Sequence, residues 1–243
     1  MLIAVSGARA QNPLIANNGG AVAPGSLISI FGSGLAAGLS VANSIPVSTT
    51  LGDVTSVTIN GQAAPLLSVS GGQINVQVPW EVSPGSASVV VTRTSGVSQP
   101  LSIQVSQYAP MAVVLNPGNL QAFVNNADGT LTATAGSLGG VSSHPATAGD
   151  TISLYATGLG AVNQPPIDGA NSADAPRQVV NPPSVTIGGV PASISFAGLS
   201  QQLVGVYEID VVVPAGAGTG SAIPVQIQTP DGINANPVTI ALQ

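Results

Sequence analysis

Two carboxylates, Glu208 and Asp210 in the segment EIDVVVP, are the side chains best placed in this sequence to do chemistry together. Residues two apart on a strand point to the same face, so the two carboxylates are expected to lie side by side. Such a pair suits acid–base work on a glycosidic bond or binding of Ca²⁺. A similar, earlier segment holds Gln73 and Asn75 at the matching positions. The amides at these matching positions indicate that this strand face is a polar, hydrogen-bonding surface. Glu208 and Asp210 are therefore weak calcium candidates.

A second oxygen-rich segment contains Asp168, Asn171 and Asp174. This spacing does not match the ligand spacing of an EF-hand loop. Asp168 and Asp174 are therefore further weak calcium candidates, and we predict no other metal site.

Nucleophilic catalysis has few residues to draw on. His144 is the only histidine, and the chain contains no cysteine. A Ser–His–Asp arrangement would depend on His144 alone, and no G-x-S-x-G segment is present. We predict no catalytic residue, no cofactor and no enzymatic activity, with His144 a solvated loop residue.

Four aromatic side chains, Trp80, Tyr108, Tyr155 and Tyr207, are candidates for a sugar-binding platform. Tyr155 aligns with Phe31 in a repeated segment, and Trp80 follows a proline at the end of a predicted strand. Both placements favour packing in a core or between domains over a binding surface.

The segment Gly32–Ala37 (GSGLAA) fits the G-x-G-x-x-A pattern of dinucleotide-binding loops. That chemistry needs a helix N-terminus directed at the pyrophosphate, whereas residues 38–46 have the composition of a loop. We therefore predict a tight turn between strands.

The elements that position these residues come in two copies. Three blocks recur in the same order, and each block is a short apolar-alternating run closed by Gly or Pro. The pairs are Gly25–Ala37 with Gly149–Ala161, Ser56–Ala64 with Ser184–Ala192, and Gln73–Pro79 with Glu208–Pro214. Period-two alternation and frequent turn residues indicate strands, and a matched order indicates an internal duplication.

The fold class predicted is all-β, with two tandem immunoglobulin-like β-sandwich domains. The expected division is residues 1–21 as a signal remnant or N-terminal strand with lead-in, 22–107 as the first sandwich, 108–118 as the linker and 119–243 as the second sandwich. The second sandwich is expected to open with a hairpin of Leu120–Val124 and Leu131–Ala135 around Asp128-Gly129. No segment predicts a helix longer than about two turns.

Composition excludes several classes of partner. The 243 residues include 30 Gly and 20 Pro, three arginines and no lysine, with a net charge of −6. Nucleic acid and anionic lipid both require a basic patch, so neither is an expected partner. No apolar run reaches the roughly 20 residues of a membrane-spanning helix.

Six segments carry a resemblance to a known family. They are Val22–Ala36, Val57–Val82, Asn126–Leu131, Gly149–Val162, Val185–Leu199 and Gly205–Pro214. They resemble the uncharacterised C-terminal domain of Solibacter and other acidobacterial surface proteins, over residues 22–243. The resemblance implies immunoglobulin-like domains of the IPT/TIG type and an extracellular or cell-surface location, and it implies no activity. It departs at Glu208 and Asp210, where the family usually has Gln and Asn.

The first ten residues admit two interpretations. Met1–Val5 (MLIAV) is apolar, and Ala8-Arg9-Ala10 fits a signal-peptidase site. Alternatively, Met1, Leu2, Ile3 and Val5 form a strand that adds to a neighbouring copy. Since edge strands are often protected by lysine, which this chain lacks, we predict a non-enzymatic structural subunit of a filament or surface layer. The alternative is an adhesion or carbohydrate-binding module with a surface glycan as partner.

Overall fold

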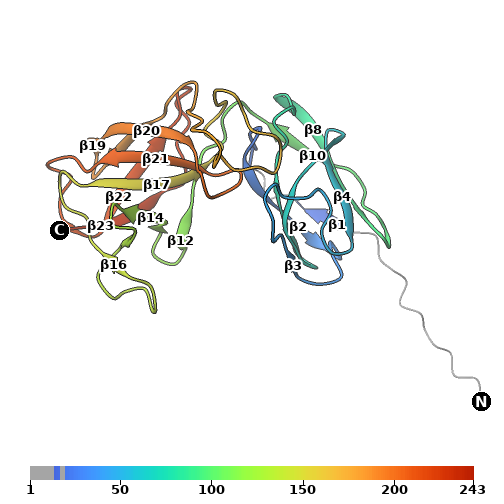
Figure 1. Cartoon of the computed structure of the whole chain (residues 1–243), viewed down its shortest axis with the longest axis horizontal. Coiled ribbons are helices and arrows are strands. Elements are labelled where there is room, and N and C mark those ends of the chain that lie inside the picture. Colours follow the sequence, from blue (N-terminus) through green and yellow to red (C-terminus); the bar gives the residue numbers. More distant parts are fainter. Residues whose placement is uncertain (1–13, 17–19) are drawn as a thin grey trace, which may run out of the picture.

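The computed structural model describes residues 14–16 and 20–243, and in these residues it contains strands, turns and loops but no helix. The chain forms two tandem immunoglobulin-like sandwiches, the first at the right and the second at the left of Figure 1. Among the residues described, none belongs to a helix with the length and apolarity needed to cross a membrane. The predicted all-β fold class is confirmed.

The first domain consists of two sheets. One has the order β1-β2-β7-β6-β3, formed by β1 (Leu14–Ala16), β2 (Leu27–Ser33), β7 (Gln73–Gln77), β6 (Leu66–Val69) and β3 (Ser40–Val41). The other has the order β10-β8-β4-β5 with β9 beside β8, formed by β10 (Leu101–Val105), β8 (Gly85–Arg93), β4 (Val54–Ile59), β5 (Gln62–Ala63) and β9 (Gly96–Val97).

The second domain also has two sheets. One has the order β16-β15-β14-β17-β21-β20 with β11 beside β17, formed by β16 (Ser143–His144), β15 (Leu131–Thr132), β14 (Val124–Asn126), β17 (Thr151–Thr157), β21 (Tyr207–Val212), β20 (Ser193–Leu199) and β11 (Met111–Ala112). The other has the order β12-β13-β23-β22-β18-β19, formed by β12 (Val114–Asn116), β13 (Gln121–Ala122), β23 (Val238–Leu242), β22 (Gly220–Gln228), β18 (Ser184–Ile187) and β19 (Val190–Pro191).

The duplication seen in the sequence is also present in the topology. The order β2-β7-β6 of the first domain recurs as β17-β21-β20, and β10-β8-β4-β5 recurs as β23-β22-β18-β19. Even a register shift is shared, since β6 slips against β7 between Leu66 and Ser68, and β20 slips against β21 between Ile194 and Phe196. Matched positions in the two domains can therefore be compared residue by residue.

Alternation fixes the faces of each sheet. In β21, Tyr207, Ile209 and Val211 are fully buried, while Glu208 and Asp210 are only partly buried. Each fully buried aliphatic side chain contributes about 1.5–3 kcal/mol to folding. Each domain has its own apolar core built this way, so the outward positions are free to carry polar side chains.

Three expectations from the sequence require correction. The Leu120–Val124 strand is divided between β13 and β14, which lie in different sheets, because the chain crosses between sheets at Phe123. The hairpin around Asp128-Gly129 is shorter than expected and pairs β14 with β15. Residues 108–118 are not only a connection, since β11 pairs with β17 and β12 with β13.

The two domains are joined by hydrogen bonds from backbone N–H groups as well as by the chain. Leu27 N, at the start of β2, donates to Thr157 Oγ1 at 2.9 Å and to Gly205 O at 3.2 Å in the second domain. Val47 N donates to Gly169 O at 2.7 Å, and Gly169 N donates to Oε1 of the buried Gln77 at 2.7 Å. The loop between β17 and β18, amber in Figure 1, thus reaches across to the first domain.

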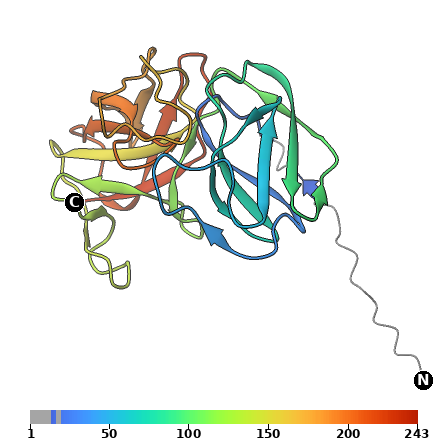
Figure 2. The ribbon, with the colours of Figure 1, turned by 45° about the vertical axis from the view of Figure 1, so that its right-hand side comes forward.

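Close backbone approach at this junction requires glycine. A Cβ on Gly169, whose φ is +80°, would lie 2.4 Å from Val47 O. Trp80 of the first domain packs against the apolar core of the second, and its backbone N donates to Asp168 Oδ1 at 3.1 Å. The two domains therefore form an interlocked pair, which Figure 2 shows from a second direction.

Candidate functional site

The outer face of the second domain carries a groove of about 550 Å³ across β17, β21 and β20. Its lining combines two aromatic rings, two carboxylates and three glutamines with a proline and a leucine. These residues are Tyr155, Phe196, Glu208, Asp210, Gln178, Gln201, Gln202, Pro176 and Leu199. The expectation that Glu208 and Asp210 share one face of a strand is confirmed.

Sheet register places an aromatic ring beside each carboxylate. Tyr155 is directly opposite Glu208 on β17, and Phe196 is directly opposite Asp210 on β20. The ring of Phe123 packs against the ring of Tyr155, with ring centroids 5.2 Å apart and planes tilted by 47°. The rings and carboxylates therefore alternate across one sheet surface at neighbouring strand positions.

The groove is electrostatically negative. Burial raises the pKa of Glu208, and the adjacent charge of Asp210 raises it further. Burial also raises the pKa of Tyr155, with additional contributions from Glu208 and Asp210. Asp210 Oδ1 accepts a hydrogen bond of 2.6 Å from Ser153 Oγ. Desolvation and like charge thus both disfavour the ionised carboxylate of Glu208 in the free protein.

The matched surface of the first domain is different. There, Gln73 Nε2 donates to Asn75 Oδ1 at 2.7 Å, and Asn75 Nδ2 donates to Ser68 Oγ at 2.9 Å. Ser29 Oγ donates to the same Asn75 oxygen at 2.8 Å. The amides and hydroxyls of this face satisfy one another, whereas in the second domain Phe196 stands at the position of Ser68 and cannot donate or accept.

Sequence reasoning missed Phe196 and the three glutamines of the groove. The repeat offers a signal for Phe196, because register places it where the first domain has Ser68. Gln178, Gln201 and Gln202 lie in loops beyond the repeated strands, so strand periodicity gives no signal for them.

The aromatic residues predicted as an alternative sugar platform do not gather at one place. Tyr207 is fully buried and donates to Gly160 O, and Tyr108 is also buried. Trp80 lies at the domain junction beside a pocket of about 320 Å³, which Glu81 and Gln107 also line. Tyr155 alone of the four belongs to the groove.

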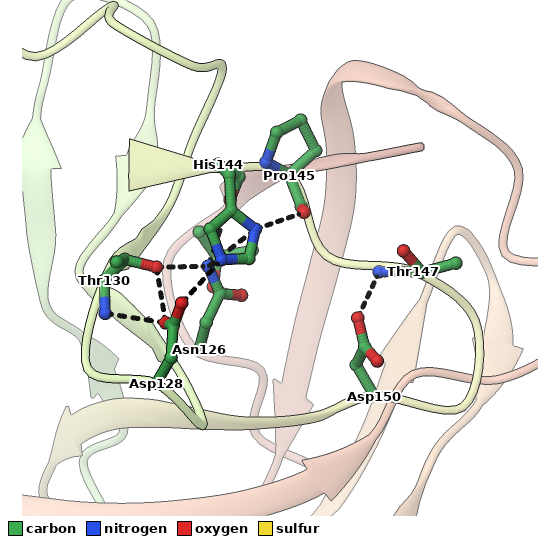
Figure 3. Close-up of polar contacts among 8 residues, drawn as sticks. Asn126, Asp128, Thr130, His144, Pro145, Thr147 and Asp150 are labelled. Carbon is green, nitrogen blue, oxygen red and sulfur yellow. Dashed lines mark hydrogen bonds and ion pairs between the residues drawn. The ribbon is translucent and has the colours of Figure 1, made fainter. Parts of the chain in front are cut away.

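His144 is bound on both sides of its ring (Figure 3). Nδ1 lies 2.8 Å from Pro145 O, and Nε2 lies 3.0 Å from Asp128 Oδ2. The Pro145 carbonyl and then Asp128 raise the pKa of His144, while hydrogen bonds from Thr130 and from His144 hold the pKa of Asp128 at about 2. Because each ring nitrogen lies within hydrogen-bond distance of an oxygen, the imidazole links β16 to the β14–β15 turn.

The weak calcium candidates are placed separately. Asp174 forms a two-point ion pair with Arg177, at 2.6 and 2.9 Å, which holds its pKa at about 2. Asp168 lies at the domain junction, where burial and then the charge of Glu81 raise its pKa to about 6. In the described part of the chain no three Asp, Glu or His side chains gather as a metal site would require. Calcium binding at Asp168, Asp174, Glu208 or Asp210 stays a prediction.

The assembly residues Met1, Leu2, Ile3 and Val5 lie outside the described residues. The segment GSGLAA forms the end of β2 and a turn, with Gly34 at φ +63° and Leu35 N donating to Gly71 O at 3.1 Å. No helix follows it, which confirms the predicted turn between strands.

A comparison with protein families decides the nature of the first domain. Residues 16–108 match the family described as IPT/TIG domain. The chain contains an IPT/TIG domain. This domain corresponds to the first sandwich, and the second sandwich repeats its sheet order. The finer resemblance to acidobacterial surface proteins stays a prediction.

Solved structures with similar folds include several tandem arrangements. SGBP-B of the Bacteroides ovatus mixed-linkage glucan utilization locus, in complex with a mixed-linkage heptasaccharide, is 16% identical with a TM-score of 0.40; the match covers 97% of this chain and 47% of that one. This chain thus spans about half of that protein. The titin Ig tandem A164–A165 is 13% identical over 95% and 96% of the two chains, with a TM-score of 0.24. Domains 5–6 of the S-layer protein SbsC are 10% identical over 95% and 98%, with a TM-score of 0.28. No curated protein sequence matches the chain significantly.

Proposed function

We propose that this chain is a non-enzymatic adhesion protein of the cell surface or extracellular space that binds a glycan in the groove of its second domain. One observation carries the proposal. Of two duplicated sheet faces, the first satisfies its own polar groups, while the second has replaced a hydroxyl with Phe196 and two amides with Glu208 and Asp210.

The chemistry of the groove suits sugars. Sugar rings present apolar C–H faces that pack on aromatic rings, and Tyr155 and Phe196 supply such rings at the sheet surface. Sugar hydroxyls need acceptors and donors, which the carboxylates and the glutamine side chains provide. A volume of about 550 Å³ lies within the roughly 300–1,000 Å³ typical of small-molecule sites.

Binding is favoured over hydrolysis by the placement of the acids. Glycosidases use two carboxyl groups that flank the scissile bond from opposite sides. Glu208 and Asp210 rise from one strand on one face, so both approach a ligand from the same side. His144, the only histidine, is held between Pro145 O and Asp128 and is not part of the groove.

The test is a glycan array followed by calorimetry on the full chain. We expect Phe196→Ser, which installs the residue of the first domain, to weaken glycan binding at least tenfold, or about 1.4 kcal/mol. Gln73→Ala is the matched control, because it alters the equivalent face of the first domain and should leave the affinity unchanged. Failure of every glycan to bind at millimolar concentration would refute the proposed function.

A second candidate is self-assembly into a filament or surface layer. Within the described residues, several large apolar side chains are exposed, including Leu39 at 77% and Ile167 at 72%. Exposed apolar surface without lysine favours contact between copies. Negative-stain microscopy of concentrated protein tests this candidate: ordered polymers support it, and dispersed monomers contradict it.

A further inference from the structure

The groove holds negative charge that no cation of the described chain neutralises. Arg93 pairs with Asp53, and the side chain of Arg177 is directed to Asp174 and to Gln164 O. Pro176 and Gln178, on either side of Arg177, do line the groove, but its guanidinium is occupied elsewhere. Among the residues described, the lining of the groove therefore offers a ligand two acidic side chains and no cationic one.

Comparison of the two duplicated faces shows that this charge is not required by the fold. In the first domain the same strand positions carry Gln73 and Asn75, and the sheet pairs there in the same way. In the second domain Glu208 is partly buried beside Asp210, and both its burial and this neighbouring charge disfavour its ionised form, which lowers stability at neutral pH. A charge that costs stability and that the fold does not require points to a role in recognition.

The aromatic rings beside the acids complete a site suited to a cation. Tyr155 is opposite Glu208 and Phe196 is opposite Asp210, so each acid has a ring on a neighbouring strand. An ammonium group is attracted by carboxylates and by aromatic faces, and the cation–π term reaches about 2 kcal/mol where water is excluded. A neutral ligand can donate hydroxyl hydrogen bonds to the two carboxylates but lacks the added charge–charge attraction, and an anionic ligand is repelled by them.

We infer that the groove selects glycans whose sugars carry a free primary amine, bound as the ammonium between Glu208 and Asp210. This inference rests on the proposed glycan binding and names its substrate class. A groove of about 550 Å³ is larger than a single ammonium needs, and its three glutamines supply partners for several hydroxyls. The lining therefore fits an amino sugar better than a lone lysine side chain.

The experiment compares three β-1,4-linked hexamers by calorimetry at pH 6: glucosamine, N-acetylglucosamine and glucose. The three share a backbone and differ in charge. We expect the glucosamine hexamer to bind at least tenfold more tightly than the other two in low salt. The preference should shrink at 0.5 M salt, where the screening length falls to a few ångströms.

A matched variant isolates the acids. Glu208→Gln with Asp210→Asn installs the amides of the first domain, and folding is checked by circular dichroism and thermal unfolding. We expect this variant to bind the three hexamers within about twofold of one another. Gln73→Glu with Asn75→Asp places the same acids on the first domain and should not alter the preference of the groove.

The outcomes separate the two proposals. Equal binding of all three hexamers to the unaltered chain refutes amine selection and leaves glycan binding standing. Binding of none refutes glycan binding itself. A lysine decapeptide that binds as tightly as the glucosamine hexamer refutes the assignment to an amino sugar, because the groove would then recognise charge alone.

Discussion

Asn75 and Asp210 occupy the same position in the two duplicated sheets. Each is paired with a serine on a neighbouring strand of its sheet, Ser29 on β2 and Ser153 on β17 respectively. Asn75 has a second hydroxyl partner in Ser68, whereas Phe196 stands at that place beside Asp210. The two domains therefore supply controls for each other. On the face of the first domain the polar side chains bond to one another, whereas on the face of the second domain the side chains at the matching positions line the groove.

Replacing Glu208 by Gln should stabilise the protein at neutral pH. The pKa of Glu208 is raised by burial and by Asp210, so its contribution is fully present below the unfolded pKa and is lost as pH rises through the folded pKa. We expect unfolding in denaturant to show a gain of about 1 kcal/mol or less at pH 7, because the side chain is partly exposed, and no gain near pH 3. A variant that is less stable than the unaltered protein at pH 7 would contradict this expectation.

The domain junction should weaken as pH rises through about 6. Burial and Glu81 raise the pKa of Asp168 from 3.8 to about 6, so the associated stability is present below 3.8 and lost between these two values. Asp168→Asn keeps an oxygen for Trp80 N and should remove this pH dependence, worth about 1 kcal/mol after screening by solvent. Chemical unfolding of the unaltered protein and of Asp168→Asn at pH 4 and pH 7 measures this pH dependence. The same pH dependence in the two proteins would contradict the prediction.

Gly169 should tolerate no side chain. A Cβ there would lie 2.4 Å from Val47 O at a φ of +80°, and both effects oppose alanine. We expect Gly169→Ala to lower the free energy of unfolding by about 2 kcal/mol or more. Gly189→Ala is the matched control, since its φ is +79° and no atom lies within 4 Å of the added carbon. Its cost should be about 1 kcal/mol, and equal costs for the two variants would refute the steric contact.

Trp80, the only tryptophan, should report on both domains at once. It belongs to the first domain and packs on the core of the second. We expect its fluorescence and the far-ultraviolet circular dichroism to follow one unfolding transition in denaturant, because loss of either core exposes the ring. Two separated transitions, with fluorescence following one of them, would show that the domains unfold independently.

His144 should titrate above its ordinary range. Its pKa is raised first by the Pro145 carbonyl and then by Asp128, so the stability from this contact is full below 6.5 and is lost as pH rises through the folded pKa. Since it is the only histidine, its ring protons give an unambiguous NMR titration. Asp128→Asn should lower this pKa, and an unchanged value would show that Asp128 does not hold the ring.

Much of the fold could be predicted because strand periodicity is local. The repeated blocks Gly25–Ala37 and Gly149–Ala161 each contain one strand, β2 and β17 respectively, as their apolar alternation predicts. The failure at Leu120–Val124 has a physical cause, since alternation shows which residues are buried but not which of two sheets takes the strand. Only tertiary pairing reveals that β13 and β14 part at Phe123.

The candidate site was predictable only in part. The shared face of Glu208 and Asp210 follows from their spacing, and the repeat reveals that they replace amides. Gln178 and Gln201 reach the groove from loops whose course depends on contacts far along the chain. The hydrogen bond from Gly169 N to Gln77 likewise joins residues 92 positions apart and left no local signal.

The bond from Leu27 to Gly205 and that from Val47 to Gly169 fix the tilt of the groove relative to the first domain. Copies anchored side by side through their first domains would hold their grooves parallel. A polymer lying across such a row would bind several grooves at once, so the overall affinity would exceed that of any single groove through avidity.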